Sequence, residues 1–493
     1  MNIENVKKAF LLQLEPNCSN HERLESYNVI QKFKSDRNGE QLRIIFQLVT
    51  DSNDFIRSSS LGLFYDVLRV EWNNYSIAEK EEVKSSLISL LISTKNVQRQ
   101  MTRIIAEVSI REWPQAWSAL TELIDTADSQ YYLTILRITG EIQFHINHQT
   151  IDNQTRHRDL STALVDRHHR LIEIVLNICE NPNHSIKEKD EVLINAGLLV
   201  ESCKHEILLK LISVKQIWSL LRDSIGLIGS PDSSICLTLF EIFIVSVSRQ
   251  VNNSSERVSL WKIFSSDDHL QIIDQVLDRA LKFSSEKEFL LVGRLAQFSD
   301  SMGNLISQCW YSPKNCEHDA LKSLFQCSDA IKFLIKVVSL KNPFLVESGI
   351  HAFQSIVKAV SGFMDTDAAT RSGKGIEDEM SSFVNMFMPK LLDSLTYFTS
   401  DQFMKKDYVK SLQGFESDGH LKSFVTKLIN VSSSLLKALA RVVPQDVGCI
   451  LSQMARRAIF EPDTGTRRVA TSLVTGTIPI IASVLQAKEI DVR

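Results

Sequence analysis

Apolar residues recur along this chain mostly three and four positions apart, and the strict alternation typical of strands is nearly absent. Such spacing indicates amphipathic helices, because side chains three or four positions apart lie on one face of a helix. With only 17 glycines and 10 prolines, turn signals are sparse. They separate helical segments of roughly 12 to 25 residues. The pattern therefore predicts an all-α protein.

The predicted helices follow one another in pairs. They are expected at residues 3–14, 20–35, 40–50, 54–72, 77–93, 97–112, 115–125, 130–146, 155–180, 186–205, 215–226, 232–250, 256–264, 268–283, 286–310, 318–338, 343–363, 378–398, 420–442, 446–460 and 464–486. Antiparallel pairs that recur about every 40–47 residues are typical of HEAT-type repeats. We predict a right-handed superhelical solenoid, an α-α superhelix, of about eleven pairs. A compact domain of unrelated helices is the alternative, since the sequence shows no strict period.

Local signals refine this picture at helix starts and at two interruptions. Capping boxes, in which a serine and a glutamate three positions later bond each other's backbone amides, are predicted for Ser19 with Glu22, Ser76 with Glu79, and Ser285 with Glu288. Residues 365–377 are polar and unpatterned, and a softer break covers 399–419, so both are expected to be loops. Insertions in a solenoid often contact partners, but a passive surface loop is the simpler explanation for each. Neither is expected to separate independent domains.

Residues 98–125 are the most informative part of the sequence. The first helix of this stretch is expected to end near Glu112, because Pro114 lacks an amide hydrogen and disfavours helical backbone at the residue before it. Pro114 also suits the first turn of a second helix. An antiparallel hairpin with a very short connection is therefore predicted. Taken alone, Trp113 and Trp117 are explained as core residues of that hairpin.

These motifs resemble the N-terminal region of the importin-β/exportin (karyopherin) superfamily, and more narrowly its exportin-5 family. The matching residues are Trp72, Asn73, Arg111, Glu112, Trp113, Pro114 and Trp117. A weaker match covers residues 415–418 and 437–444. The resemblance extends over most of residues 1–460 and is strongest near 55–125. Within it, the tryptophans are expected to be scaffold residues that set helix geometry.

The resemblance implies a HEAT solenoid with no catalytic activity and no cofactor. Proteins of this kind bind the GTP form of the Ran GTPase together with cargo in the nucleus, and release both in the cytoplasm. The implied partners are Ran-GTP, nuclear pore proteins and hairpin RNA with a double-stranded stem, which is recognised through its shape and backbone. Ran is expected to bind the repeats of residues 1–150, and residues 151–493 are expected to continue the repeat array. The protein is expected to shuttle between nucleus and cytoplasm.

Family members are more than twice as long as this chain of 493 residues. The array is therefore expected to be truncated, as a fragment or as a short paralogue without the later cargo-clamping repeats. A solenoid that ends without a polar cap exposes apolar surface. The chain alone is accordingly expected to aggregate or to need a partner.

Clusters of charged residues supply the candidate contacts, because the planar fork of arginine suits carboxylates and phosphates alike. Candidates for Ran lie on the polar face of helix 97–112 and are Arg99, Arg103 and Glu107. Candidates for RNA phosphates are Arg441, Arg456, Arg457, Arg467 and Arg468. A third group is expected to form a solvated basic helix face, and comprises Arg156, Arg158, Arg167, His168, His169 and Arg170. An ordinary solvated face is the simpler explanation for the first two clusters as well.

The composition is that of a globular protein, with 44% hydrophobic and 23% charged residues. Net charge is −4 and the isoelectric point is about 6.3, so no global basic field attracts nucleic acid. Any RNA contact therefore needs local basic patches. No apolar run approaches the ~20 residues that cross a bilayer, so membrane insertion is not expected.

No pattern in the sequence predicts catalysis, since P-loop, dinucleotide, zincin and nucleophile-elbow motifs are all missing. The eight cysteines are scattered, with no C-x-x-C pair, and are expected to be reduced thiols. Cys309, Cys316, His318 and Cys327 are spaced too widely for a typical zinc site. We therefore predict neither an enzyme nor a metal site. The alternative function to transport is a Ran-independent HEAT scaffold for protein assembly.

Overall fold

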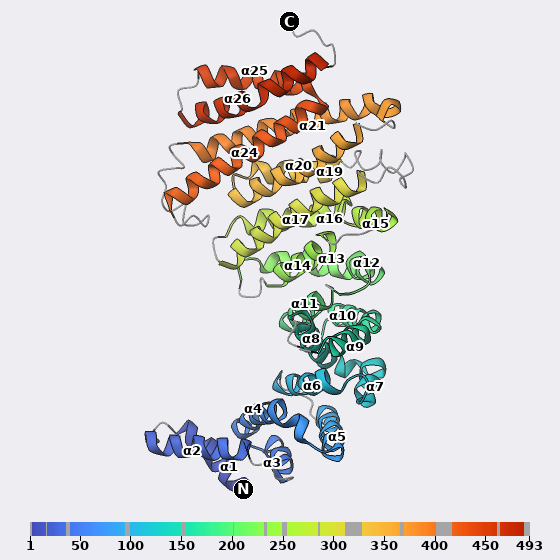
Figure 1. Ribbon diagram of the computed structural model, residues 1–493, viewed down its shortest axis with the longest axis vertical. Coiled ribbons are helices and arrows are strands. Elements are labelled where there is room, and N and C mark those ends of the chain that lie inside the picture. Colours follow the sequence, from blue (N-terminus) through green and yellow to red (C-terminus); the bar gives the residue numbers. More distant parts are fainter. Residues whose placement is uncertain are drawn as a thin grey trace. The chain divides into compact units, whose positions relative to one another are not determined.

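The computed structural model describes residues 2–15, 17–35, 40–93, 99–148, 151, 153–200, 202–230, 234–248, 254–283, 286–310, 328–364, 369–400, 417–460 and 464–487. Every regular element in these ranges is a helix (Figure 1). The helices pack as successive pairs, as a HEAT-type solenoid requires. The predicted fold class is confirmed.

The chain divides into two compact units, Met1–Ile207 and Leu208–Arg493. The division falls inside α12 (His205–Ser213), so it does not test the assignment of residues 1–150 to Ran, which stays a prediction. The elements of the first unit are α1 (Ile3–Leu14), α2 (Asn20–Lys34), α3 (Glu40–Val49), α4 (Asp54–Glu71), η1 (Trp72–Asn74), α5 (Ile77–Ser93), α6 (Arg99–Glu112), α7 (Ser118–Thr126), η2 (Ser129–Tyr131), α8 (Tyr132–Asn147), α9 (Gln154–Val165), α10 (His168–Glu180) and α11 (Ile186–Val200).

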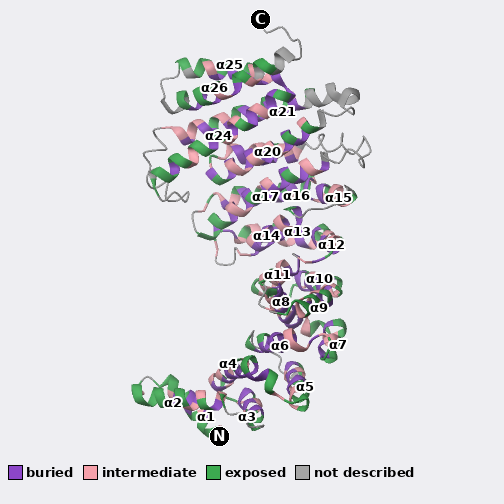
Figure 2. Cartoon of the chain, in the orientation of Figure 1, coloured by how far each residue is buried: buried purple, intermediate pink, exposed green. Residues whose placement is uncertain are grey.

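In the first unit α4, α6, α8 and α11 pack side by side in chain order, and we call them the first row. α3, α5, α9 and α10 pack against this row as a second layer. The two inner helices of the row, α6 and α8, therefore pack against another row helix on each side and against helices of the second layer behind. Only a narrow strip of each faces solvent, and Figure 2 shows buried positions along the faces where these helices meet.

The second unit repeats the two-layer arrangement. Its elements are α13 (Lys215–Ser224), η3 (Ile225–Leu227), α14 (Ser234–Ser248), α15 (Ser254–Phe264), α16 (Asp267–Ala280), α17 (Glu286–Trp310), α19 (Ser328–Ser339), α20 (Pro343–Met364), α21 (Ala369–Thr399), α24 (Asp418–Val442), α25 (Pro444–Phe460) and α26 (Thr464–Ala487). One layer stacks α14, α17, α20, α24 and α26 in that order. The other stacks α13, α16, α19, α21 and α25.

Aromatic side chains fill the space between the two layers at the start of the second unit. Trp218 on α13 stacks on Phe243 of α14 with ring centroids 4.8 Å apart. Phe264 on α15 makes edge contacts with Phe243 and with Phe298 of α17, each at 5.4 Å. Edge-to-face aromatic pairs stabilise a core beyond their buried area. They join four helices of successive pairs into one core.

Most predicted helices are present with ends within a few residues of those expected. The differences concern the helix at 155–180, an additional helix and the two expected loops. The single helix expected at 155–180 is two, because α9 ends at Val165 and α10 begins at His168. The helix α12 was not predicted. The loop expected at 365–377 is wrong from Ala369 on, where α21 begins. That stretch holds good helix formers and no proline, so its two glycines do not stop the helix. Residues 365–368 and 401–416, which contain most of the second expected loop, lie outside the described residues.

Two of the three predicted capping boxes are present. In both, the glutamate accepts the serine amide at 2.8 Å and its own amide donates to the serine hydroxyl, for Ser19 with Glu22 and for Ser76 with Glu79. These donors lower the pKa of both glutamates, the serine hydroxyl contributing most. Ser285 lies outside the described residues. A box that the sequence reading missed, Ser185 with Glu188, begins α11.

Two glycines of α17 give a matched test of this packing. A Cβ on Gly303 would overlap the backbone of Ala352 on α20, whereas a Cβ on Gly293 meets nothing. Gly303→Ala is expected to lower the free energy of unfolding by about 1–3 kcal/mol, because α17 and α20 must move apart. Gly293→Ala is expected to raise it by about 0.5–1 kcal/mol through helix propensity. Urea-denaturation midpoints of the two variants measure the difference, and equal midpoints would contradict this packing.

Candidate partner-binding surface

The two sequence motifs of the first unit bind to each other. Trp72, which is buried, donates its indole Nε1–H to Glu112 Oε1 at 2.8 Å. Glu112 Oε2 lies 3.7 Å from Nζ of Lys84, a lysine of α5 that is itself buried. A charge removed from water is tolerated only when it is paired and hydrogen-bonded. Glu112 therefore ties together the end of α4, α5 and α6.

The neighbouring Arg111 serves the same junction. Its guanidinium donates to the carbonyl oxygens of Leu68 and Arg69, each at 3.1 Å, and pairs with Glu107 at 2.7 Å. The last carbonyls of a helix have no partner within the helix and carry a partial negative charge, so a cation there is favourable. Arg111 thus fastens α6 to the C-terminal end of α4.

Both tryptophans that follow are in the core. Trp113 is fully buried and donates its Nε1–H to Thr121 Oγ1 at 2.9 Å, and Trp117 is 3% exposed. The Trp113–Pro114 peptide bond is cis, and residues 113–117 form a turn before α7 begins at Ser118. The expectation that Pro114 would occupy the first turn of the next helix is therefore wrong. The connection is longer than expected because it folds both indole rings into the core.

The third arginine group is not the solvated face that the sequence predicted. Arg156 donates to the carbonyl oxygens of Ser109 and Ile110, each at 2.8 Å, and also to that of Trp113. Arg167 pairs with Asp125 at 2.9 Å and lies over the Trp113 ring. Arg170 donates to Ala127 at the end of α7, and His168 is fully buried. Arg156 and Arg170 thus bind carbonyl oxygens at the ends of α6 and α7, and Arg167 pairs with a side chain of α7. The exposed members of the group are Arg158 and His169.

The exposed strip of the first row holds one clear candidate contact. Arg103 is 58% exposed, lies over the Tyr65 ring at 5.7 Å, and is 4.0 Å from Glu141 of α8. Glu107 is only 4% exposed, so its expected place on an open polar face is wrong. The reason is that α6 packs against both α4 and α8, which leaves room for only one exposed line of residues. Arg99 begins α6, but its side chain lies outside the described residues.

Two rings beside Arg103 are uncharged at neutral pH. Burial raises the pKa of the Tyr65 hydroxyl, and the Glu107 carboxylate adds to the effect. Burial lowers the pKa of the His145 imidazole, which outweighs the opposing influence of Glu107 and Glu141. The formal charges on this part of the strip are therefore those of the arginines and carboxylates.

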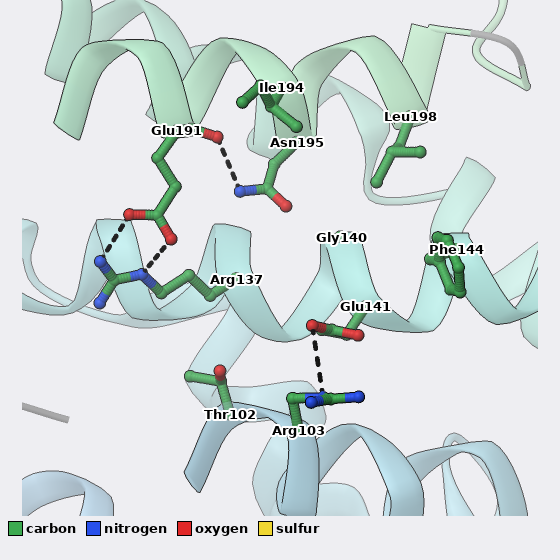
Figure 3. A pocket seen from close by; sticks show the side chains of 10 residues that line it. All are labelled: Thr102, Arg103, Arg137, Gly140, Glu141, Phe144, Glu191, Ile194, Asn195 and Leu198. Carbon is green, nitrogen blue, oxygen red and sulfur yellow. Dashed lines mark hydrogen bonds and ion pairs between the residues drawn. The ribbon is translucent and has the colours of Figure 1, made fainter. Parts of the chain in front are cut away.

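A groove continues the strip between α8 and α11 (Figure 3). Its volume is about 290 Å³. Phe144 on α8 and Ile194 on α11 line it and are 42% and 51% exposed. At one end Arg137 binds Glu191 through two hydrogen bonds of 2.8 and 2.7 Å. The sequence reading missed this groove, because apolar periodicity does not reveal which apolar side chains a neighbouring helix leaves uncovered.

The arginines proposed for RNA fall into two places in the second unit. Arg456 and Arg457 end α25, Arg467 and Arg468 lie in the first turns of α26, and all four are exposed. They gather at one end of this helix pair, because only three residues join the helices. Arg441 is exposed at the end of α24, near the opposite end of α25, which separates it from Arg456 by about 18 Å of helix.

The described residues contain no grouping of three or more His, Cys, Asp or Glu side chains that could hold a metal ion. Cys309 is buried, while Cys316, His318 and Cys327 lie outside the described residues. Among the described helices, none is both long and apolar enough to cross a membrane.

Comparisons with known proteins agree with this geometry. The family "Exportin 1-like protein" matches residues 94–236, which include α6 and the groove. Exportin-5 of Mus musculus is 23% identical over 330 residues, which cover 62% of this chain and 27% of the mouse protein. Exportin-5 of Homo sapiens is 25% identical over 205 residues, covering 36% and 16% of the two chains. Exportin-5 of Dictyostelium discoideum is 22% identical over 142 residues, covering 27% and 12%.

The paired helices form an all-α solenoid of HEAT type, and residues 94–236 are similar to a family of exportin 1-like proteins. The similarity to exportin-5 of three organisms supports an exportin-5-like member of the importin-β/exportin superfamily. The matched segments span about a quarter of the length of the mouse relative and less of the other two.

Two arginines of α9 test the role of the ties between helix pairs. Arg156→Gln is expected to lower the free energy of unfolding by about 1–3 kcal/mol, because buried carbonyl oxygens lose charged donors. Arg158→Gln removes the same charge from an exposed position two residues away and is expected to leave stability unchanged. Thermal unfolding of both variants measures the effect. An equal response would show that Arg156 contributes only its charge.

Proposed function

We propose that this protein is a nuclear transport receptor that binds Ran-GTP and carries structured RNA or protein from nucleus to cytoplasm. The observation that carries the proposal is the combined similarity to an exportin family and to exportin-5 of three organisms. Passage through the pore would involve nuclear pore proteins, and the receptor would be found in both compartments. The work of such a receptor is binding and release, with no catalytic step of its own.

The first row is the proposed Ran-binding surface. Arg103 is well placed to pair with a carboxylate of the GTPase, because its present ion pair with Glu141 is at the outer limit of contact. Arg69 is also exposed and lies on the adjacent row helix. Glu107 supports this surface indirectly, since it is buried against Arg111. Charged groups at the exposed part of an interface mainly set its specificity and association rate.

Ran binding is expected to depend on the nucleotide and on Arg103. Immobilised GTP-locked Ran should retain the chain, and GDP-loaded Ran should not. Arg103→Glu is expected to weaken binding to GTP-locked Ran by about tenfold, because it places like charges in contact. Arg158→Glu is the matched control and should bind as the unaltered chain does. Equal binding to both nucleotide forms, or to neither, would instead favour the Ran-independent scaffold.

The arginines around the α25–α26 connection are the proposed RNA contacts. Replacing Arg456, Arg457, Arg467 and Arg468 by glutamine is expected to reduce the salt dependence of binding to a short RNA hairpin, measured with Ran-GTP present. Each phosphate contact contributes about 0.7–0.9 to the slope of log K against log salt concentration. Losing four contacts would therefore lower the slope by about three.

A control with the same loss of charge uses four exposed basic residues of the first unit, changed to glutamine: Lys8, Arg23, Lys32 and Arg43. This variant is expected to keep the slope of the unaltered chain. Arg441→Gln, tested alone, should change the slope by at most about one. If neither set alters the slope, the cargo is a protein or the RNA binds elsewhere.

A further inference from the structure

The groove between α8 and α11 has an apolar part, bordered by charged and polar side chains. Phe144 and Ile194 leave close to half of their surfaces in solvent, and Leu198, one turn beyond Ile194, also lines the groove. Figure 3 shows these three side chains along the two facing helices. Contiguous apolar surface with a polar border marks an interaction site more often than an ordinary surface.

The two ion pairs of the rim differ in strength. Arg137 and Glu191 satisfy each other through the bidentate geometry that makes such pairs strong. Arg103 and Glu141 are 4.0 Å apart, and the arginine side chain is 58% exposed. Arg103 can therefore turn to an incoming carboxylate at little cost, whereas Arg137 cannot. The rim favours a partner that brings negative charge to the Arg103 side.

The shape of the groove selects the form of the partner. It lies open between helices, and its lining combines three apolar side chains with Thr102, Asn195 and the two ion pairs. The helices beside it have no strand edge to extend, which leaves a helix as the regular element that fits. Ile194 and Leu198 lie one turn apart, about 6 Å along α11. A partner helix with two apolar side chains one turn apart matches that spacing.

We propose that the α8–α11 groove binds an amphipathic helix of a partner protein. The helix sets two apolar side chains, one turn apart, against Ile194 and Leu198 opposite Phe144, and it places an adjacent carboxylate on Arg103. The inference rests on the groove alone and holds whether or not the chain binds Ran or RNA. It assigns the uncovered apolar strip of α8 and α11 to recognition of an acidic helical segment.

The test uses a displayed library of 16-residue peptides on a helix-forming background. Two positions one turn apart and their polar neighbours are randomised. The library is selected on the full chain and counter-selected on the double variant Ile194→Ser with Arg103→Gln. Enriched peptides are expected to carry an apolar pair with Asp or Glu beside it. Binding of one synthetic peptide, followed by fluorescence anisotropy, should weaken at least about tenfold in the double variant.

Matched controls keep the residue types and move them out of the groove. Ile186→Ser with Arg158→Gln changes an exposed isoleucine of α11 and an exposed arginine of α9, and should bind the peptide as the unaltered chain does. Replacing the peptide's acidic residue by lysine should weaken binding by about tenfold. Circular dichroism verifies that each variant is folded.

Three outcomes would overturn the proposal: no enrichment after counter-selection, enrichment without acidic residues, or equal weakening by the control variant. Ran binding is measured separately on Ile194→Ser alone. If the unaltered chain binds the peptide but not Ran-GTP, the proposed function is overturned and the groove assignment stays in place. If the unaltered chain binds Ran-GTP but selects no peptide, the groove assignment is overturned and the proposed function stays in place.

Discussion

The first unit depends on arginine side chains that reach back to the carbonyl ends of the preceding helix pair. Arg111 holds the end of α4, and Arg156 holds the end of α6. Carbonyl oxygens in the last turn of a helix lack some of their usual intrahelical partners. Those of Leu68 and Ser109 each accept one backbone amide and, in addition, a guanidinium. A guanidinium serves two or three of them at once, which the single ammonium of lysine cannot do with the same geometry. Each tie also fixes one pair in register with the next.

α6 is the centre of this arrangement, because it gives one tie and receives another. Glu112, at its end, accepts a hydrogen bond from Trp72 and pairs with Lys84. The residues that carry the family resemblance are thus structural, while Arg103 lies nine residues before Glu112, about 14 Å along the helix. The motif that identifies the chain and the surface proposed for its partner occupy different parts of one helix. A substitution at the exposed Arg103 therefore leaves the junction at Glu112 intact.

Helix positions could be predicted from the sequence because periodicity and capping boxes are local signals, as at Ser19 and Ser76. The burial of Glu107 could not be predicted, since its environment depends on a helix one pair away. The same limit explains Arg156 and Arg167, which look like surface charge in the sequence and are ties in the structure. Phe144 and Ile194 show the converse. Their apolar character is visible in the sequence, but the exposure that makes them candidate contacts comes from how α8 and α11 meet.

This use of arginine changes how the charge of the chain bears on its partners. A net charge of −4 already excludes a general attraction to nucleic acid, and several arginines of the first unit are committed to helix ends. The cations left on the first row are few, and Arg103 lies beside apolar surface. One exposed, weakly paired arginine beside apolar side chains suits a short acidic helix better than a long row of phosphates, which needs many cations in line. The arginines at the α25–α26 connection come closer to providing several cations for a row of phosphates, because four of them lie at one end of a single helix pair. The surfaces proposed for protein and for RNA therefore lie in different units of the chain.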